Sequence, residues 1–421
     1  MENMESRMKD QKLRFTIACK NFPVRSQTFI LNQILDLIDK GHDVNIVVYE
    51  ANKELLGQVD PKYRLAERIS TTDMPQSFVL RVFGLLIFTV THPAFFIKIL
   101  QTVNFFKFGK IALSLKLFYS AKVFLKQPKY DLYQAHFGEV GMILSILKSI
   151  GIVDGRIITT FHGYDAHFSD ATFATTKAIY TQLFGAKDNR FTVNSDYTKN
   201  QIISLGAREN TIYNLPVGLD TQKYQRKTKT TQREQLRLIS VGRLVPFKGF
   251  EYSIRAVAKL VNDGFFQIHY SIIGEGTQYV FLDSLIKQLG MSQHVFLIGA
   301  KSQEEVIAKM SDSDLFVHPA IRENNGRQEN QGLVIQEAQA LELPVITTRT
   351  GGIPEGLIEN KTGLLVEEKN IDHLANSILF FAQNKPEIER FGKAGRDFVV
   401  QNFDIKTIND RLVSVYEEVL K

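Results

Sequence analysis

The chain of 421 residues contains a single cysteine, Cys19. One thiol excludes an intrachain disulfide, and a chain without disulfides suits a reducing compartment. The first residues, Met1 to Lys12, are highly charged and include no apolar run of the kind that a secretory signal needs. The sequence therefore predicts a cytoplasmic protein, and its length is enough for two domains of ordinary size.

The sequence also lacks the motifs of several enzyme classes. No His, Cys or Asp cluster has the spacing of metal ligands, and no Gly-x-Ser-x-Gly motif occurs. The segment Ile272-Ile-Gly-Glu-Gly-Thr-Gln-Tyr279 begins like a dinucleotide-binding fingerprint, but Tyr279 takes the place of the third glycine. Neither a metal ion nor a nicotinamide cofactor is expected.

Acidic residues are absent between Asp73 and Asp131, an interval that holds one arginine, seven lysines and ten phenylalanines. Its longest apolar run, Val82 to Ile97, is interrupted by His92 and Pro93. The run is therefore shorter than the roughly 20 apolar residues that a bilayer span needs.

Basic residues that alternate with Phe, Leu and Ile are typical of helices lying on an anionic membrane surface. Residues 74–130 are thus a candidate for peripheral contact with the inner face of the plasma membrane. The other interpretation, that the phenylalanines form a core and the lysines face water, stays open. No nucleic-acid-binding motif accompanies the basic residues, and no nucleic-acid partner is expected.

Strand-like segments alternate with helical segments, which predicts an α/β protein with parallel, doubly wound sheets. The first set of strands is expected at 13–19, 43–49, 132–135, 156–160 and 191–193, and the second set at 237–241, 269–273, 295–298, 315–318, 345–347 and 363–366. The polar run Thr221 to Glu234 between the two sets is interpreted as a surface linker or loop.

This pattern predicts two Rossmann-like domains that face each other across a central cleft, with ligands at the carboxyl ends of the strands. We expect an N-terminal, acceptor-binding domain over residues 1–215 and a C-terminal, nucleotide-sugar-binding domain over 216–404. The last helix, residues 405–421, is amphipathic and is expected to pack back toward the N-terminal domain.

The most informative segment is Arg322 to Thr348, which holds Glu329 in a polar loop and Glu337 in the helix that follows. A loop that enters a helix presents free N–H groups and a partial positive charge, which suits a phosphate. Glu337 lies about 7 Å along the helix axis from Gly332, at about 1.5 Å per residue. One helix could therefore hold a diphosphate at its tip and a ribose hydroxyl one turn further in. The simpler interpretation makes both residues solvated surface acids.

Two further motifs follow predicted strands. In Ser240-Val-Gly-Arg-Leu-Val-Pro-Phe-Lys-Gly249, the cations Arg243 and Lys248 lie where they could neutralise a leaving diphosphate, or they could serve only solubility. In Thr160-Phe-His-Gly-Tyr-Asp165, His162 lies on a tight turn where a ligand can approach closely, although a lone histidine is more often structural.

With Gly351-Gly-Ile-Pro-Glu355 in addition, the chain resembles the family-four retaining glycosyltransferases of the GT-B fold. The opening segment, Asn21 to Gln33, resembles the subset that builds bacterial exopolysaccharides of the colanic-acid type. The resemblance covers nearly the whole chain and is loosest between about Asn52 and Lys129, the region expected to meet the acceptor.

The resemblance implies a role for each matching residue. Arg243 and Lys248 would hold the donor diphosphate, and Glu337 would bind the ribose hydroxyls. His162 would lie by the anomeric carbon, and Glu329 would contact hydroxyls of the donor sugar. Backbone N–H groups would cradle sugar and phosphate at Asn330, Gln331, Gly332 and Leu333. No cofactor or metal would be needed.

The chain departs from the family pattern in two loops. The first-strand loop reads Lys20-Asn-Phe-Pro23 in place of a glycine pair, and Glu342 replaces the glycine that often follows the nucleotide-binding helix. A residue other than glycine in a left-handed cap costs about 1 kcal/mol, so this second turn is expected to differ in shape.

Together these observations predict a retaining glycosyltransferase that moves a hexose from a UDP- or GDP-sugar to a polysaccharide or lipid-linked oligosaccharide. A nucleotide-sugar epimerase on the same scaffold and a non-catalytic sugar-nucleotide-binding subunit are the alternatives. An epimerase needs a set of acid and base groups that the sequence does not identify, and a phosphorylase would need a cofactor lysine that is equally absent from the recognisable motifs.

Overall fold

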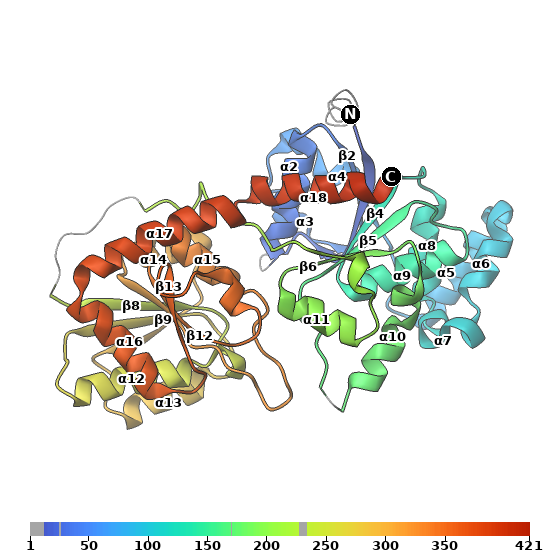
Figure 1. Cartoon of the computed structure of the whole chain (residues 1–421). Helices are drawn as coiled ribbons and strands as arrows, with labels where there is room; N and C mark the ends of the chain where they lie inside the picture. The colour runs from blue at the N-terminus through green and yellow to red at the C-terminus, as the bar shows by residue number, and fades with distance from the viewer. Residues whose placement is uncertain (1–11, 25–26, 170, 227–233) are drawn as a thin grey trace.

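Two parallel β-sheets, one after the other along the chain, organise the structure (Figure 1). It is a computed structural model that describes residues 12–24, 27–169, 171–226 and 234–421. Within these residues the first sheet has seven strands in the order β3-β2-β1-β4-β5-β6-β7, and the second has six in the order β10-β9-β8-β11-β12-β13. Each order reverses once, and such switch points are where doubly wound sheets bind ligands.

The first domain carries helices on both faces of its sheet. Its strands are β1 (Arg14–Phe22), β2 (Asp43–Ala51), β3 (Ile69–Thr71), β4 (Leu132–His136), β5 (Arg156–Phe161), β6 (Arg190–Val193) and β7 (Ile212–Asn214). Its α-helices are α2 (Thr28–Asp39), α3 (Lys53–Leu56), α4 (Leu65–Arg68), α5 (Phe78–Thr91), α6 (Phe96–Thr102), α7 (Phe105–Leu113), α8 (Lys116–Leu125), α9 (Gly138–Ser149), α10 (Phe173–Gly185) and α11 (Asp196–Ser204).

The second domain repeats the alternation of strand and helix. Its strands are β8 (Leu236–Val241), β9 (Ile268–Ile273), β10 (Val295–Gly299), β11 (Leu315–His318), β12 (Val345–Thr348) and β13 (Gly363–Val366). Its α-helices are α12 (Phe250–Asn262), α13 (Tyr279–Gln288), α14 (Gln303–Ser311), α15 (Leu333–Ala340), α16 (Ile371–Gln383) and α17 (Lys385–Phe403), and α18 (Ile405–Leu420) follows. The predicted architecture of two parallel, Rossmann-like domains is confirmed, although the sequence did not reveal the three-residue strands β3 and β7.

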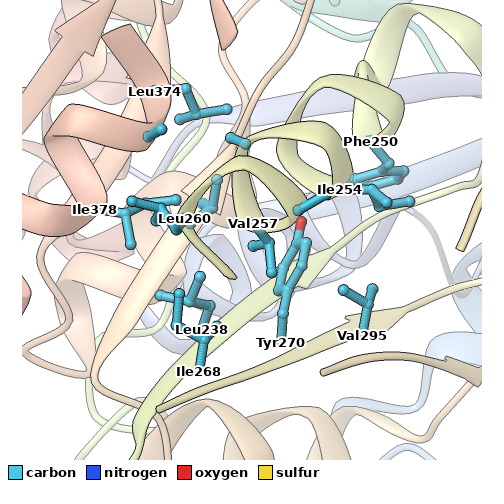
Figure 2. Close-up of a cluster of buried hydrophobic side chains, with 14 of the residues drawn as sticks. Leu238, Phe250, Ile254, Val257, Leu260, Ile268, Tyr270, Val295, Leu374 and Ile378 are labelled. Atoms are coloured by element: carbon cyan, nitrogen blue, oxygen red, sulfur yellow. The ribbon is translucent and has the colours of Figure 1, made fainter. Parts of the chain in front are cut away.

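The core of the second domain forms where α12 and α16 cover β8 and β9 (Figure 2). Buried Leu238, Ile254 and Val257 surround the ring of Tyr270. The Tyr270 hydroxyl lies 2.6 Å from Ser240 Oγ and 2.7 Å from Ser253 Oγ, so the one polar atom in this cluster is hydrogen-bonded. The apolar period of these helices thus holds β8 in place, and the end of β8 positions part of the candidate site.

The last helix, α18, leaves the second domain and lies along the first (Figure 1). Its Tyr416 is fully buried in the first domain's core, 5.3 Å from the Phe15 ring. Asn409 Nδ2 donates to Asp36 Oδ2 over 2.9 Å, which ties α18 to α2. The first domain is therefore built from both ends of the chain.

The chain crosses between the domains twice, and the two crossings are bonded to each other. The Leu219 N–H donates to the Phe403 carbonyl, and the Ile405 N–H donates to the Leu219 carbonyl, each over 2.9 Å. Thr221 Oγ1 also donates to an Asp404 carboxylate oxygen. These bonds hold the two crossings together as one connection.

The polar run after the first crossing is a loop where the structure describes it, with Gln222, Lys223 and Gln225 exposed, but two of its side chains are not on the surface. Thr221 and Tyr224 are buried, because the Tyr224 ring packs into the second domain's core. The prediction of a surface loop therefore agrees with the exposed residues and is wrong for Thr221 and Tyr224, and residues 227–233 lie outside the described residues.

The turn after α15 was expected to change shape because Glu342 replaces glycine, and that expectation is wrong. Glu342 adopts the left-handed conformation itself, with φ +57°. The Leu343 N–H still donates to the Ala338 carbonyl over 3.0 Å, as in a normal left-handed helix end. The protein keeps the turn and accepts about 1 kcal/mol of backbone strain.

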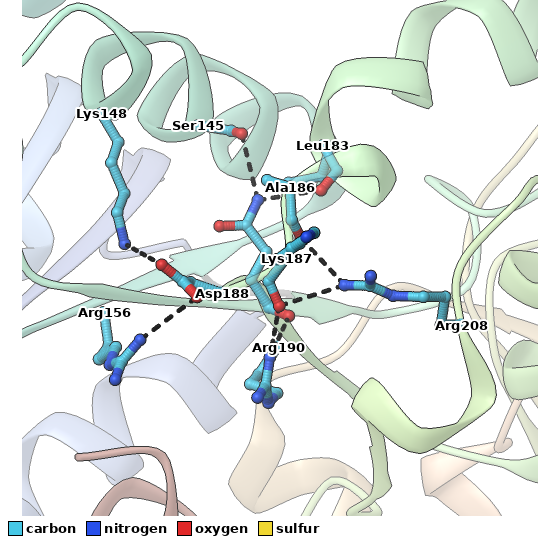
Figure 3. Close-up of polar contacts among 10 residues, drawn as sticks. Ser145, Lys148, Arg156, Leu183, Ala186, Lys187, Asp188, Arg190 and Arg208 are labelled. Carbon is cyan, nitrogen blue, oxygen red and sulfur yellow. Dashed lines mark hydrogen bonds and ion pairs between the residues drawn. The ribbon is translucent and has the colours of Figure 1, made fainter. Parts of the chain in front are cut away.

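Basic side chains gather at the edge of the first sheet where β5 and β6 begin (Figure 3). Asp188 lies between Arg156 and Lys148, with ion-pair distances of 3.5 and 3.9 Å. A cavity of about 410 Å³ adjoins this cluster, lined in part by Lys148 and Asp188. The cavity lies at the amino ends of the strands, away from the carboxyl ends at which doubly wound sheets bind ligands.

Candidate active site

The carboxyl ends of the two sheets face each other, and two cavities lie between the domains. One, of about 880 Å³, is lined by Leu333 and Glu337 of the second domain and by Leu55 of the first. The other, of about 910 Å³, is lined by His162, Arg243 and Glu329, among others. Phe29 of α2 lines both cavities and so separates them. Such a cleft can hold a ligand with two chemically different halves.

Helix α15 begins at the boundary of these cavities. Gly332 precedes it with φ +69°, a left-handed conformation that glycine adopts without strain. The N–H groups of residues 330–333 donate to no acceptor within the described residues. Unpaired donors at and just before a helix N-terminus can bind an anion.

A glycine pair lets a second loop close over this one. A Cβ on Gly351 would lie 1.7 Å from the Glu329 carbonyl oxygen, and a Cβ on Gly352 would lie 1.7 Å from that of Asn330. No residue larger than glycine fits at such distances. The motif Gly351-Gly352 therefore sets the position of the loop that carries Glu329 and Asn330.

Glu337 projects from the first turns of α15 and lines the cavity of about 880 Å³. Its Oε1 accepts a hydrogen bond of 2.8 Å from the Tyr224 hydroxyl, which in turn accepts one of 2.9 Å from Gln303 Nε2. Burial raises the pKa of Glu337 to about 7, while the Tyr224 hydrogen bond and the Lys248 charge oppose that rise. The second carboxylate oxygen, Oε2, has no protein partner among the described residues, so it can accept a hydroxyl of a ligand.

Glu329 forms a buried ion pair with Lys248, the cation at the end of the turn that follows β8. Burial by itself raises the pKa of Glu329, but the Lys248 ammonium and the neighbouring His318 together outweigh burial and hold the pKa far below the usual range. His318 Nε2 lies 3.4 Å from Glu329 Oε2, yet it makes no hydrogen bond of good geometry there. Burial lowers the pKa of His318, so this imidazole is neutral beside an ionised carboxylate.

Arg243 lies one turn before Lys248 and is exposed to the second cavity. Its guanidinium has no ion pair or side-chain hydrogen bond with any residue that the structure describes. The cleft therefore holds two cations: Arg243, which is unpaired among the described residues, and Lys248, which is paired with Glu329 and lowers the pKa of Glu337. Cations in such a position can pair with the oxygens of a diphosphate.

His162 follows β5 and lies against a second buried histidine. His136 Nδ1 and His162 Nε2 are 3.0 Å apart, and burial lowers the pKa of both rings, so both are neutral. The rings of Phe29 and Phe137 each lie 4.7 Å from the His162 ring. His162 Nδ1 is buried and has no hydrogen-bond partner, which leaves one ring nitrogen free for a ligand.

Asp165 fixes the two loops that carry these histidines. Its carboxylate accepts hydrogen bonds from the N–H groups of Gly138, His162 and Gly163, at 2.9, 3.0 and 3.0 Å. Burial raises the pKa of Asp165 to about 6, against the effect of these backbone donors. The Asp in the predicted His-Gly-x-Asp motif thus has a positioning role.

The domains touch at the edge of the cleft. Glu355 Oε2 accepts from the Asp196 N–H over 2.8 Å and Oε1 from the Tyr197 N–H over 3.3 Å, so a second-domain carboxylate caps helix α11 of the first. The Gln331 side chain bonds both backbone groups of Val217, over 2.8 and 2.9 Å. These contacts fix the loop of residues 329–332 relative to the first domain.

The structure places the residues singled out from the sequence around this one cleft. The Gln331 side chain points toward the first crossing, although its backbone N–H stays free, and Lys248 lies behind the cavity wall, paired with Glu329. The sequence did not single out Tyr224, His318 or Phe29. His318 ends a strand as His162 follows one, so the same signal could have found it, whereas Tyr224 lies in a polar run and gave none. In the described residues no group of three His, Cys, Asp or Glu could hold a metal ion.

Two facing Rossmann-like domains with this cleft define a GT-B glycosyltransferase fold. Residues 221–398 match the family described as Glycosyl transferases group 1. The chain is 30% identical over 403 residues to the colanic acid biosynthesis glycosyltransferase WcaL of Salmonella typhimurium, covering 94% of this chain and 98% of that protein. The chain therefore belongs to the group 1 glycosyltransferases, and the prediction of this family is confirmed.

Two further similarities agree with this family. The amylovoran biosynthesis glycosyltransferase AmsK of Erwinia amylovora is 26% identical over 417 residues, covering 96% of this chain and 99% of that protein. HepE of Anabaena, in a crystal structure with UDP, has a TM-score of 0.71 at 17% identity, covering 96% of this chain and 100% of that one. The HepE similarity supports the fold.

Proposed function

We propose that the protein is a retaining hexosyltransferase. It takes a hexose from a UDP- or GDP-sugar and adds it to a polysaccharide or a lipid-linked oligosaccharide. The observation that carries the proposal is the convergence of three donor-binding elements at one cleft. These are the ion-paired Lys248, the free N–H groups before α15 and the Glu337 carboxylate.

The donor would span the two cavities. Its nucleoside would occupy the cavity of Leu333 and Glu337, where the free Glu337 Oε2 accepts a ribose hydroxyl. Its diphosphate would lie at the start of α15, with Arg243 and Lys248 as counter-charges. The hexose would then reach the cavity of His162 and Glu329. The HepE complexes with UDP and UDP-glucose support a nucleotide-sugar donor.

Transfer would proceed with retention, by attack on the face from which the diphosphate leaves. The bond between the anomeric carbon and the diphosphate oxygen breaks, and an acceptor hydroxyl oxygen bonds to the same carbon. The hydroxyl proton passes to a phosphate oxygen of the departing nucleoside diphosphate. Because Glu329 stays ionised beside Lys248, it would stabilise positive charge on the sugar and accept hydrogen bonds from the sugar hydroxyls. Metal independence is part of the proposal, since two protein cations would balance the leaving group.

The acceptor would enter the cavity lined by aromatic side chains of both domains. Phe137 and the exposed Tyr164 lie 5.1 Å apart there, and Phe247 lies on the opposite wall. Aromatic faces beside polar groups suit a sugar ring. The names of the colanic acid and amylovoran relatives support a saccharide acceptor, and contact with a membrane through residues 74–130 would bring a lipid-linked one within reach.

A panel of nucleotide sugars, assayed without added metal, tests the proposal. A ligand that binds only the folded protein stabilises it by about 2.7 kcal/mol at roughly one hundred times its Kd. We expect one donor to raise the melting temperature and to be slowly hydrolysed. Lys248→Ala and Glu337→Ala should lose both effects, whereas Lys361→Ala, an exposed lysine of the same domain, should keep them.

Near-normal donor binding and turnover in both site variants would refute the site. Stereochemical change of a donor sugar without any acceptor would favour the epimerase, and tight donor binding without hydrolysis or transfer would favour a binding subunit. Nothing in the structure favours either of these functions.

A further inference from the structure

An apolar surface on helices α5, α6 and α7 has no partner in the structure. Between Phe78 and Leu113 lie thirteen of the 22 exposed large hydrophobic side chains of the described residues. Val90, Ile97 and Phe106 are 79%, 71% and 89% exposed. Contiguous exposed apolar surface on this scale marks an interaction site. We call the surface of residues 78–113 the apolar face.

The apolar face lies at the outer end of the first domain, away from the second (Figure 1). Helix α5 buries only Phe88, although its sequence is almost entirely apolar. Its one charged residue, Arg81, is used internally, because the guanidinium donates to the carbonyls of Pro75, Gln76 and Ser114. No single described helix is long and apolar enough to cross a membrane. Helix α5 and the segment 93–102 reach that length and hydropathy only as a pair, and the pair is bent by 106°.

Charge identifies the kind of partner. The interval from 74 to 130 has no acidic residue, and Lys107 and Lys110 stand exposed on α7 beside Phe105 and Phe106. Neither lysine has an ion pair within the described residues. Exposed apolar side chains beside unpaired cations match the interface of an anionic bilayer, where the apolar groups enter the acyl boundary and the cations meet phosphate.

We infer that the apolar face docks the first domain on an anionic phospholipid bilayer. The helices lie along the bilayer surface, since α5 and α6 are bent away from each other at His92 and Pro93. A protein partner would need complementary acids around an apolar centre, and a second copy of this chain offers only the same cations to its own. Like charges opposed across a twofold contact disfavour self-association.

The segment that follows the apolar face leads back to the carboxyl end of the first sheet. Arg81 of α5 reaches the Ser114 carbonyl at the end of α7, over 3.0 Å. Lys116 follows, with its Nζ 4.9 Å from the ring of Tyr49, which lies near the carboxyl end of β2. If the proposed function holds, an acceptor carried by a bilayer lipid would lie near the carboxyl end of the first sheet, which also borders the cleft.

Flotation of the full-length protein with vesicles tests the inference. The vesicles are phosphatidylcholine mixed with phosphatidylglycerol, or phosphatidylcholine alone, at low and high salt. We expect flotation with the anionic vesicles at low salt and little with the neutral ones. The combined variant Val90→Asn, Ile97→Asn and Phe106→Asn should reduce flotation about tenfold or more, and so should Lys107→Glu with Lys110→Glu.

Matched controls carry the same kinds of substitution at exposed positions outside the apolar face. Phe266→Asn with Val280→Asn removes exposed apolar side chains of the second domain, which are 63% and 75% exposed. Lys187→Glu with Lys361→Glu reverses two exposed charges, one of them in the cluster of Figure 3. Both controls should float like the unchanged protein. Melting temperature and donor hydrolysis, measured on every variant, should stay unchanged and so separate membrane docking from folding and from the proposed catalytic site.

Three results would overturn the inference. They are the absence of flotation with anionic vesicles at low salt, an equal loss in the control variants, and a dimer in lipid-free sedimentation that the apolar-face variant abolishes. The last result would assign the face to self-association. Failure to find any sugar donor would count against the proposed function and leave the flotation result standing.

Discussion

The Tyr224 hydroxyl donates a 2.8 Å hydrogen bond to the Glu337 carboxylate, although 113 residues separate the two in the chain. Tyr224 follows the first crossing between the domains, and Glu337 is the residue expected to hold the donor ribose. The Tyr224 backbone carbonyl also accepts from Arg396 of α17, so the tyrosine is held at both ends. The segment that connects the domains is thereby bonded to the helix that carries Glu337.

Donor affinity should depend on pH through Glu337. Burial raises the pKa of this carboxyl to about 7, so its ionised fraction falls as the pH decreases through that value. A carboxylate accepts hydrogen bonds from ribose hydroxyls better than a carboxylic acid does. We therefore expect the Kd for the donor to rise below pH 7. Isothermal titration across pH 5 to 9, about two units on either side, would measure it.

Replacing Tyr224 by Phe should move that pH dependence. The Tyr224 hydrogen bond lowers the pKa of Glu337, and one net hydrogen bond is worth about 1 kcal/mol. Its loss should shift the midpoint upward by roughly half to one pH unit. Tyr213→Phe, which removes a 2.8 Å hydrogen bond to Glu418 on the surface of the first domain, is the matched control. An unchanged midpoint in Tyr224→Phe would show that the tyrosine only fills space.

Replacing Glu329 by Gln should slow transfer and donor hydrolysis by on the order of a hundredfold to a thousandfold, the usual effect of losing one preorganised electrostatic group. The amide keeps the shape of the side chain but not its charge. Glu329 stays ionised at all pH values near neutrality. We therefore expect the transfer rate of Glu329→Gln to fall at the same acidic pH as that of the unchanged protein. Glu359→Gln, which breaks a surface ion pair with Arg349, should leave the rate unchanged.

The ion pair between Glu329 and Lys248 should also affect the stability of the protein in acid. The folded-state pKa of Glu329 is lowered, so its stabilising contribution is fully present above the unfolded pKa, near 4.5, and is lost as the pH falls below that value. We expect the melting temperature of the unchanged protein to fall more steeply below pH 4.5 than that of Glu329→Gln. Parallel melting curves would mean that the pair contributes little to stability.

Replacing Gly352 by Ala should damage the site through its backbone. The added Cβ would lie 1.7 Å from the Asn330 carbonyl oxygen and 2.7 Å from Ser195 Cβ of the other domain, so one of the two loops must move. We expect a loss of several degrees in melting temperature and a larger loss of turnover. Gly185→Ala meets no atom within 4 Å and should change neither.

The architecture was predictable because long apolar periods and glycine positions define it. Gly351 and Gly352 were recognisable as a motif, and each lies where a Cβ would collide with a carbonyl oxygen. The strands β3 and β7 were missed because three residues carry too little pattern. The turn at Glu342 was judged from conformational preference alone, and tertiary packing of the turn overrode that preference.

The site was predictable only where a motif marks it. Lys248 and Glu329 lie in motifs that end strands or begin helices, and the structure pairs them. Tyr224 and His136 act on site residues from other elements, and their contacts depend on how loops far apart in the sequence come together. Spacing along the chain does not encode such contacts.

The burial of α18 in the first domain has a consequence for synthesis on the ribosome. Domains of a growing chain generally fold from the N-terminus onward. Here Tyr416, which completes the core beside Phe15, is made after every strand of the second domain. The second domain can therefore finish folding while the first still exposes the apolar surface of α2 that awaits α18. In this protein the half translated first is the half completed last.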